Sequence, residues 1–267
     1  MNRIRKYKDF LVENESDYSL TQDQIEFLDR GCVLKGIPRI GTKAWGLNKE
    51  TGKVTLHFDF YASNKGLTDL MGIRFEKAYG DFNISSNSIK SLEGCPEYVG
   101  GKFVCSDNEL ESLEGGPIRV EGSYHCSRNK LKTLKGCAEK IGGGFLCDSN
   151  ELENLIGGPK LVWNEYECSN NHLISLEGLG AMGSTSSFKC DGNPIPEKIL
   201  SRVASYMHYY QTRSYKTAVK NIWHALSIEE RCALYLPEFD WIPEKEKGEL
   251  EKAKYHFEKF NKIKHLL

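Results

Sequence analysis

The sequence has no long apolar run, no excess of one charge sign and no C-x-x-C pair. No stretch reaches the roughly 18 consecutive apolar residues of a transmembrane helix, and charged residues follow closely on Met1, so we expect a cytoplasmic protein with no membrane span. Lys+Arg total 36 against Asp+Glu 37, a net charge of -1. This balance disfavours nucleic acid as a partner, because binding to phosphates depends on clustered basic charge.

Without C-x-x-C spacing, the nine cysteines do not form a common zinc motif. Five of them instead fall at one phase of a repeat, at Cys105, Cys126, Cys147, Cys168 and Cys190. A buried free cysteine behaves as a small apolar residue, and thiols stacked in register do not give tetrahedral coordination. We therefore interpret these five as reduced core residues and expect neither a metal nor a cofactor. Cys95 and Cys137 fall outside this phase and are expected in outer loops.

The dominant pattern is an internal repeat marked by asparagine. Five asparagines recur at intervals of 21 residues, and a sixth follows after 22: Asn87, Asn108, Asn129, Asn150, Asn171 and Asn193. An aromatic column has the same interval: Phe82, Phe103, Tyr124, Phe145, Tyr166 and Phe188. One coil reads Phe103-x-Cys105-x-x-Asn108-x-Leu110-x-x-Leu113, which matches the leucine-rich pattern L-x-L-x-x-N-x-L-x-x-L. Units this short cannot fold alone and must stack.

Each coil is expected to contribute one strand to a parallel sheet. Gly101–Cys105 should pair with its counterparts at roughly 4.8 Å, with Phe103 and Cys105 pointing inward. The amide of Asn108 should satisfy backbone groups of neighbouring turns that would otherwise be buried and unpaired. Leu113–Val120 contains glycine and proline, which favour extended or polyproline-like backbone, with Val120 as an inward anchor.

The repeat predicts an α+β chain with three regions. Residues 54–195 form a leucine-rich-repeat solenoid with parallel strands and a non-helical convex side, residues 1–53 an N-terminal cap, and residues 196–267 a C-terminal helical domain or cap. The N-terminal cap is expected to contain two helices and a hairpin: Arg3–Glu13, Gln22–Asp29 with Thr21 as N-cap, and Lys43–Leu47 with Lys53–Phe60. The C-terminal helices are expected at Glu197–Tyr210, Lys216–Leu226, Glu229–Leu236 and Glu244–Lys264.

Two motifs carry a resemblance to a known family. They are Ser91-Leu92-Glu93-Gly94-Cys95-Pro96-Glu97-Tyr98-Val99-Gly100-Gly101, followed by Phe103-x-Cys105-Ser106, and the earlier Trp45-Gly46-Leu47-Asn48. Over about residues 30–195 the chain resembles the leucine-rich-repeat proteins of tailed bacteriophages. The resemblance implies a leucine-rich-repeat-like fold and expression in an infected bacterium. It suggests a host bacterial protein, such as a defence component, as the partner.

The candidate binding surface lies between the inward strand positions. A concave face should present Asn83, Val104, His125, Leu146, Glu167 and Lys189. Its middle is mildly apolar and its surroundings are charged, like the core and rim of an interface. Trp163 replaces a repeat glycine, so its ring should be exposed, and exposed tryptophans are frequent binding hot spots. The predicted partner-binding residues are Val104, His125, Leu146, Glu167, Arg128 and Trp163. Two lateral columns alternate in charge, Lys90-Glu111-Lys132-Glu153 and Glu109-Lys130-Glu151, and should form ion pairs between coils.

These features predict a non-enzymatic protein-binding factor with no catalytic residues. Neither His125 nor His172 has a triad partner at a recognisable spacing, and the glycine-rich segments are repeat turns rather than phosphate loops. One alternative is a protein that sequesters a nucleotide or small molecule, using Arg202, Tyr206, His208, Tyr209 or Arg213. Another is a structural or virion-associated interaction protein. The pattern does not indicate an oligomeric state.

Overall fold

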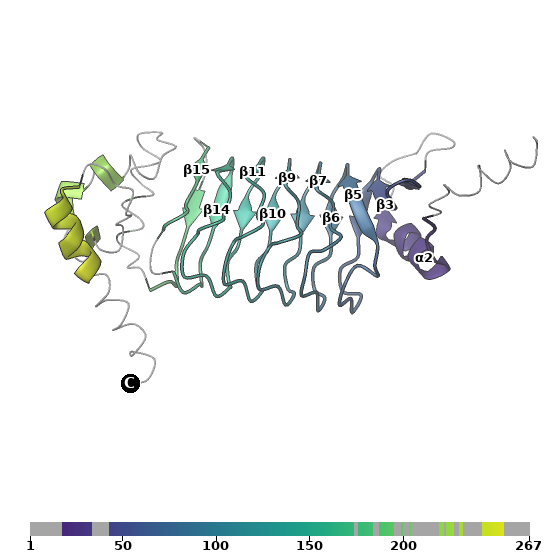
Figure 1. Cartoon of the computed structure of the whole chain (residues 1–267), viewed down its shortest axis with the longest axis horizontal. Coiled ribbons are helices and arrows are strands. Elements are labelled where there is room, and N and C mark those ends of the chain that lie inside the picture. Colours follow the sequence, from purple (N-terminus) through teal and green to yellow (C-terminus); the bar gives the residue numbers. More distant parts are fainter. Residues whose placement is uncertain are drawn as a thin grey trace, which may run out of the picture.

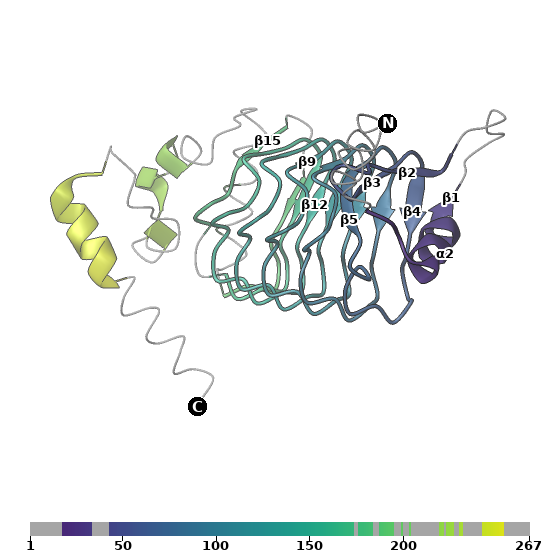
Figure 2. The same ribbon diagram turned by 45° about the vertical axis from the view of Figure 1, so that its right-hand side comes forward.

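The computed structural model describes residues 18–33, 43–173, 176–183 and 187–194, and the shorter pieces 199, 203, 219–221, 223–226, 230–231 and 242–253. The chain forms a parallel β-solenoid in which each coil stacks on the one before it (Figures 1 and 2). The coils contribute strands to two eight-stranded sheets, which run along the two long sides of the solenoid. The Cα partners Phe103, Tyr124 and Phe145 show that the 21-residue interval of the sequence is the interval of the coils.

Sheet A contains the predicted parallel strands with the aromatic column. Its order is β1-β4-β6-β8-β10-β12-β14-β16, and only the β1–β4 pair is antiparallel. The bounds are β1 Cys32–Val33, β4 Asp59–Tyr61, β6 Phe82–Asn83, β8 Phe103–Val104, β10 Tyr124–His125, β12 Phe145–Leu146, β14 Glu165–Glu167 and β16 Ser187–Lys189.

Sheet B, on the other side of each coil, was not predicted. Its order is β15-β13-β11-β9-β7-β5-β3-β2, and only the β2–β3 pair is antiparallel. Most of its strands span two residues, which is too short for side-chain alternation to reveal a strand. The predicted inward position of Val120 is confirmed, and its counterparts Val99, Ile141 and Val162 are buried in the same way. The bounds are β2 Trp45–Leu47, β3 Lys53–Leu56, β5 Arg74–Ala78, β7 Tyr98–Val99, β9 Arg119–Val120, β11 Lys140–Ile141, β13 Leu161–Val162 and β15 Ala181–Met182.

The core between the two sheets is continuous from coil to coil. From Phe82 to Tyr166 the rings of the aromatic column are buried, and neighbouring ring centroids lie between 4.9 and 6.0 Å apart. Phe188 is half-buried and packs against this core. The five cysteines of the repeat are also buried. The Sγ atoms of Cys105 and Cys126 each donate to a carbonyl oxygen of the next coil at 3.4 Å. The predicted inward direction of both columns is therefore confirmed.

An asparagine ladder connects the coils along one edge of this core. The Oδ1 atom of Asn108 accepts the backbone N–H of Ile89 at 3.0 Å. Its Nδ2 atom donates to the carbonyl oxygens of Ile84 at 3.0 Å and Cys105 at 3.1 Å. The other asparagines of the repeat make the equivalent hydrogen bonds, one repeat further along the chain each time. As predicted, each amide satisfies backbone groups that the stacked coils bury.

Cys95 and Cys137 lie in loop segments, as predicted, but they pack into the core and do not face outward. Cys95 is 5% exposed and belongs to the core, and Cys137 packs against it. The turn at Gly94 explains the difference, because its left-handed backbone (φ 87°) brings the chain back toward the core at the next residue. The next coil has Gly116 at this position, and the hydroxyl oxygen of Tyr124 lies 3.1 Å from where a Cβ on Gly116 would be. The tyrosine hydroxyl therefore occupies the space beside this glycine.

The buried hydroxyl of Tyr124 has no hydrogen-bond partner in the part of the chain that is described. An unpaired buried hydroxyl costs about 1–3 kcal/mol, and a small cavity left by its removal offsets part of that. Tyr124→Phe is therefore expected to raise the free energy of unfolding by about 1 kcal/mol in urea denaturation. Tyr98→Phe, on the half-buried outer side of sheet B, is the control and should change it by less than about 0.5 kcal/mol. A loss of stability in Tyr124→Phe would contradict the prediction.

Helix α2 (Gln22–Gly31) precedes the first coil. The Thr21 hydroxyl accepts the N–H of Gln24, and the Gln24 side chain accepts the N–H of Thr21, so the predicted N-cap is confirmed as a capping box. The helix continues beyond the predicted end at Asp29. Its Leu28 is fully buried, which fixes the helix against the solenoid.

The predicted hairpin is present as β2 and β3, which pair antiparallel. The prediction of one strand from Lys53 to Phe60 was wrong. Strand β3 ends at Leu56, the chain turns, and Phe60 lies in β4 of sheet A. Alternation of apolar and polar residues continues through the turn, so the sequence did not reveal the change of sheet.

The terminal predictions are testable only in part. Arg3–Glu13 lies outside the described residues, as do the five tail residues named for the small-molecule alternative. Residues 244–253 are helical, within the predicted Glu244–Lys264, and Trp223–Ala225 forms the short 3-10 helix η1. Trp223 is buried, and its indole N–H donates to Glu246 at 3.2 Å.

Candidate binding surface

Four of the predicted partner-binding residues form one row on the outer face of sheet A. Val104, His125, Leu146 and Glu167 lie in β8, β10, β12 and β14, and each is aligned with the next through the parallel register. All four are half-buried, because each side chain is flanked by those of the coils on either side. The hydrogen-bonded ladder fixes their spacing at roughly 4.8 Å per coil. We call these four residues the sheet A row.

Arg128 lies at the carboxyl end of β10, beside the row. It forms a two-point ion pair with Asp107 of the preceding coil, at 2.5 Å from Nε and 2.7 Å from Nη2. The Arg128 guanidinium lowers the pKa of the Asp107 carboxyl by donating to it. Both residues have left-handed backbone, with φ of 52° and 57°, so their side chains leave the strand direction at the same point of each coil.

The end of the sheet A row next to β16 is charged. Lys189 on β16 forms ion pairs with Glu165 at 2.5 Å and with Glu167 at 3.7 Å. Along the row itself, Val104 and Leu146 present apolar surface on each side of His125. The arrangement matches the predicted apolar middle with a charged surround.

Ion pairs between coils also occur in the lateral columns. The predicted pairs Lys130–Glu109, at 3.2 Å, and Lys132–Glu111, at 3.4 Å, are present. Lys90 lies 4.0 Å from Glu109 of the other column, so pairing also crosses between columns. These groups are exposed, and such pairs contribute roughly 0.2–1 kcal/mol each.

The surroundings of His125 favour the neutral form of its imidazole. Burial lowers its pKa, and the positive charge of Lys102 lowers it further, while Asp148 and Glu165 act in the opposite direction. A neutral ring between Val104 and Leu146 keeps the middle of the row uncharged, which favours contact with an apolar partner surface.

The pKa shift predicts how stability depends on pH. Because folding lowers the pKa of His125, the unfolded chain takes up this proton first as the pH falls. The free energy of unfolding should therefore decline below about pH 6.5, the ordinary histidine pKa, until the folded pKa is reached. His125→Gln should make this decline shallower in urea denaturation at several pH values, with His172→Gln as the control for loss of an exposed histidine. An NMR titration in which His125 titrates above pH 6.5 would contradict the prediction.

Trp163 is exposed, as predicted, but does not lie in the row. It is 45% exposed and sits at the corner between β13 of sheet B and β14 of sheet A. Val162, the last residue of β13, points into the core. Trp163 therefore falls at the turn that follows. The structure therefore brings together four of the six predicted residues, places Arg128 at their edge, and separates Trp163 from them.

The cysteine column has the properties of packed side chains. Burial raises the pKa of Cys105, Cys126 and Cys147 well above the ordinary thiol value. The thiolate, which is the form that binds metals and attacks substrates, is therefore disfavoured. Among the described residues, no group of three or more His, Cys, Asp or Glu side chains is placed to hold a metal ion.

We compared the chain with protein-family models, curated proteins and solved structures. None of them matches. The function must therefore be inferred from the surface itself. In the described part of the chain, no helix has both the length and the apolar character needed to cross a bilayer.

Sequence reasoning missed two features of the surface. The first is the Arg128–Asp107 ion pair, which could have been found because opposite charges stand one repeat apart. The second is a cavity beside Trp45, described below, which forms where α2 approaches β2. No repeat relates these two elements, so no periodic signal could indicate that they meet.

Proposed function

We propose that this protein is a non-enzymatic binding protein whose sheet A row holds a partner protein. The observation that carries the proposal is the in-register placement of Val104, His125 and Leu146, with one ion pair beside the row and another at its β16 end. An apolar centre with a polar rim is the usual composition of a protein interface. The hydrogen-bonded strands of sheet A hold these side chains in place before binding, so little conformational entropy is lost on association.

The proposal includes a biological setting that rests on sequence resemblance. The coils are leucine-rich repeats of the kind carried by tailed phages, and the N-terminal helix and hairpin and the C-terminal helical region cap the ends of the solenoid. The protein acts in the cytoplasm of an infected bacterium, where it occupies or inhibits a host protein such as a defence component. Support comes from the motifs over about residues 30–195 and from the asparagine ladder, because ladders of this kind suit repeats that must stack to fold.

A pull-down from host-cell lysate with mass spectrometry tests this function. The wild-type protein should capture one specific host protein, and Val104→Asp/Leu146→Asp should lose it, because two carboxylates in the interface core are desolvated without partners. Leu161→Asp is the matched control, since Leu161 is a half-buried aliphatic residue on sheet B. Circular dichroism of all three proteins checks that the solenoid is intact.

The outcomes separate the possible sites. A host protein retained by the double variant but lost by Leu161→Asp would move the binding surface to sheet B. A protein that captures nothing, and that is found only in purified virus particles, would favour a structural component of the virion instead.

A further inference from the structure

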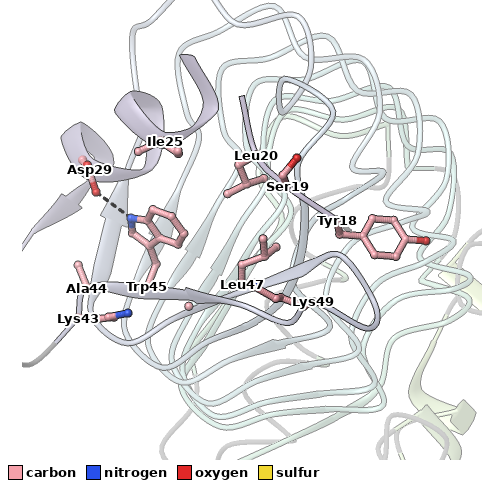
Figure 3. A pocket seen from close by; sticks show the side chains of 11 residues that line it. Tyr18, Ser19, Leu20, Ile25, Asp29, Lys43, Ala44, Trp45, Leu47 and Lys49 are labelled. Carbon is pink, nitrogen blue, oxygen red and sulfur yellow. Dashed lines mark hydrogen bonds between the residues drawn. The ribbon is translucent and has the colours of Figure 1, made fainter. Parts of the chain in front are cut away.

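A cavity of about 740 Å3 lies at the N-terminal end of the solenoid, beside β2 (Figure 3). One wall is formed by helix α2 and the residues that lead into it, Tyr18–Leu20. The other wall is formed by β2, with Lys43 before it and Lys49 after it. Its volume lies within the range of about 300–1,000 Å3 that is usual for binding sites. The sheet A row does not line this cavity, so it is a separate candidate site.

Within the described residues, β2 is the strand at one edge of sheet B, with β3 as its neighbour. The N–H of His57 donates to the carbonyl of Ala44 at 3.0 Å, and the N–H of Asn48 donates to the carbonyl of Lys53 at 2.9 Å. Because bonding groups alternate along an antiparallel strand, the N–H and C=O groups of Trp45 and Leu47 face away from β3. Within the described residues these groups have no hydrogen-bond partner. An edge of this kind is a template for another strand.

The side chains around the cavity determine which residues an added strand must carry. Leu20, Ile25 and Leu47 give it an apolar interior together with the ring of Trp45 (Figure 3). The indole N–H of Trp45 donates to Asp29 at 2.8 Å, which fixes the ring against α2.

The charged groups at the cavity determine which charges a bound strand must carry. The Asp29 carboxylate accepts the Trp45 hydrogen bond, so it is already engaged within the site. Lys43 and Lys49 place positive charge at the two ends of β2. The complementary ligand is therefore apolar in the middle and acidic at both ends.

We propose that this cavity binds an extended peptide segment of a partner protein, added as a strand to the edge of β2. The peptide backbone bonds to Trp45 and Leu47, one apolar side chain enters the cavity, and acidic side chains lie beside Lys43 and Lys49. A strand rises roughly 3.3 Å per residue, so the two acidic residues stand about six positions apart. Backbone pairing supplies affinity, while the cavity and the lysines supply selectivity. The site is independent of the function proposed for the sheet A row.

A labelled seven-residue peptide, Glu-Thr-Val-Thr-Val-Thr-Glu, tests the proposal, because strand alternation places its two valines on the same face as its two glutamates. Fluorescence anisotropy should show binding to the full-length chain, and a version with N-methylated backbone should bind at least about tenfold more weakly, a loss of about 1.4 kcal/mol. In NMR, hydrogen exchange of the Trp45 and Leu47 amides should slow by at least about tenfold on binding, while that of Gly46, which faces β3, stays unchanged. Absence of binding, or equal binding of the methylated peptide, would overturn the proposal.

A charge swap provides the matched test of selectivity. Lys43→Glu/Lys49→Glu should prefer a lysine-ended peptide over the glutamate-ended one by at least about tenfold, reversing the wild-type preference. Lys77→Glu, an exposed residue of β5 in the same sheet, should keep the wild-type preference.

Two further results test whether the chain itself already covers the edge of β2, and whether this site is independent of the sheet A row. If the amides of Trp45 and Leu47 are already protected without peptide, residues of the chain itself occupy the edge and the proposal is wrong. The Val104→Asp/Leu146→Asp protein should bind the peptide as wild type does, so failure of one site does not imply failure of the other.

Discussion

Replacing Asn108 with alanine is expected to lower the free energy of unfolding by about 3–5 kcal/mol. The change removes the acceptor for the N–H of Ile89 and the donor for the carbonyls of Ile84 and Cys105. Each buried backbone group left without a partner costs about 1–3 kcal/mol. Alanine also leaves a small cavity between two coils, which adds to the loss. Urea denaturation followed by circular dichroism measures the effect.

The control for Asn108→Ala is Asn164→Ala. Asn164 is exposed at the corner before β14, so its replacement should change the free energy of unfolding by less than about 0.5 kcal/mol. A loss below about 1 kcal/mol for Asn108→Ala would mean that the freed backbone groups find other partners, and that the ladder is not what holds the coils in register.

Gly136→Ala is expected to destabilise the protein by more than about 3 kcal/mol, because two penalties act together. The backbone of Gly136 is left-handed, with φ of 89°. A Cβ there would lie against the backbone N of Glu114 and 2.5 Å from the carbonyl carbon of Leu113. These atoms belong to the backbone of the preceding coil, so relief of the clash requires the two coils to separate. Thermal and urea denaturation should both show the loss.

Gly66→Ala isolates the first of these penalties. Gly66 is also left-handed, with φ of 70°, but no heavy atom lies within 4 Å of the place that a Cβ would take. Its replacement should therefore cost only the conformational term, about 1–2 kcal/mol. Equal losses in the two variants would show that the close approach at Gly136 is relieved at little cost, contrary to the prediction.

The 21-residue interval was enough to predict one sheet, the core columns and the role of the asparagines. These features repeat, so an agreement at Asn108 is tested again at Asn129 and Asn150. Sheet B was missed because a strand such as Arg119–Val120 has no pattern of its own. Its pairing arises only when the next coil places Lys140–Ile141 beside it. Proline and glycine nearby indicated extended backbone correctly but gave no information on hydrogen bonding.

Of the candidate surfaces too, only the part that belongs to the repeat could be predicted from the sequence. The sheet A row was predictable because strand alternation fixes which side chains point outward. The position of Trp163 was harder to predict, because a residue at the corner between β13 and β14 does not follow the side-chain alternation of either strand. The cavity beside Trp45 depends on the approach of α2 to β2, which is seen in the hydrogen bond from Trp45 to Asp29 and in the lining that the two elements share. Features that lie outside the repeat therefore needed three-dimensional contacts to be found.

The shared register of the coils makes the length of the protein adjustable in whole units. Deleting residues 106–126 would join Cys105 to Ser127, and the aromatic, cysteine and asparagine columns would close again between Phe103 and Asn129. Each coil removed or added would change the length of the outer face by one strand spacing, roughly 4.8 Å. Duplication or loss of a short in-frame segment would therefore lengthen or shorten the outer face by whole coils, while the core keeps the same three columns.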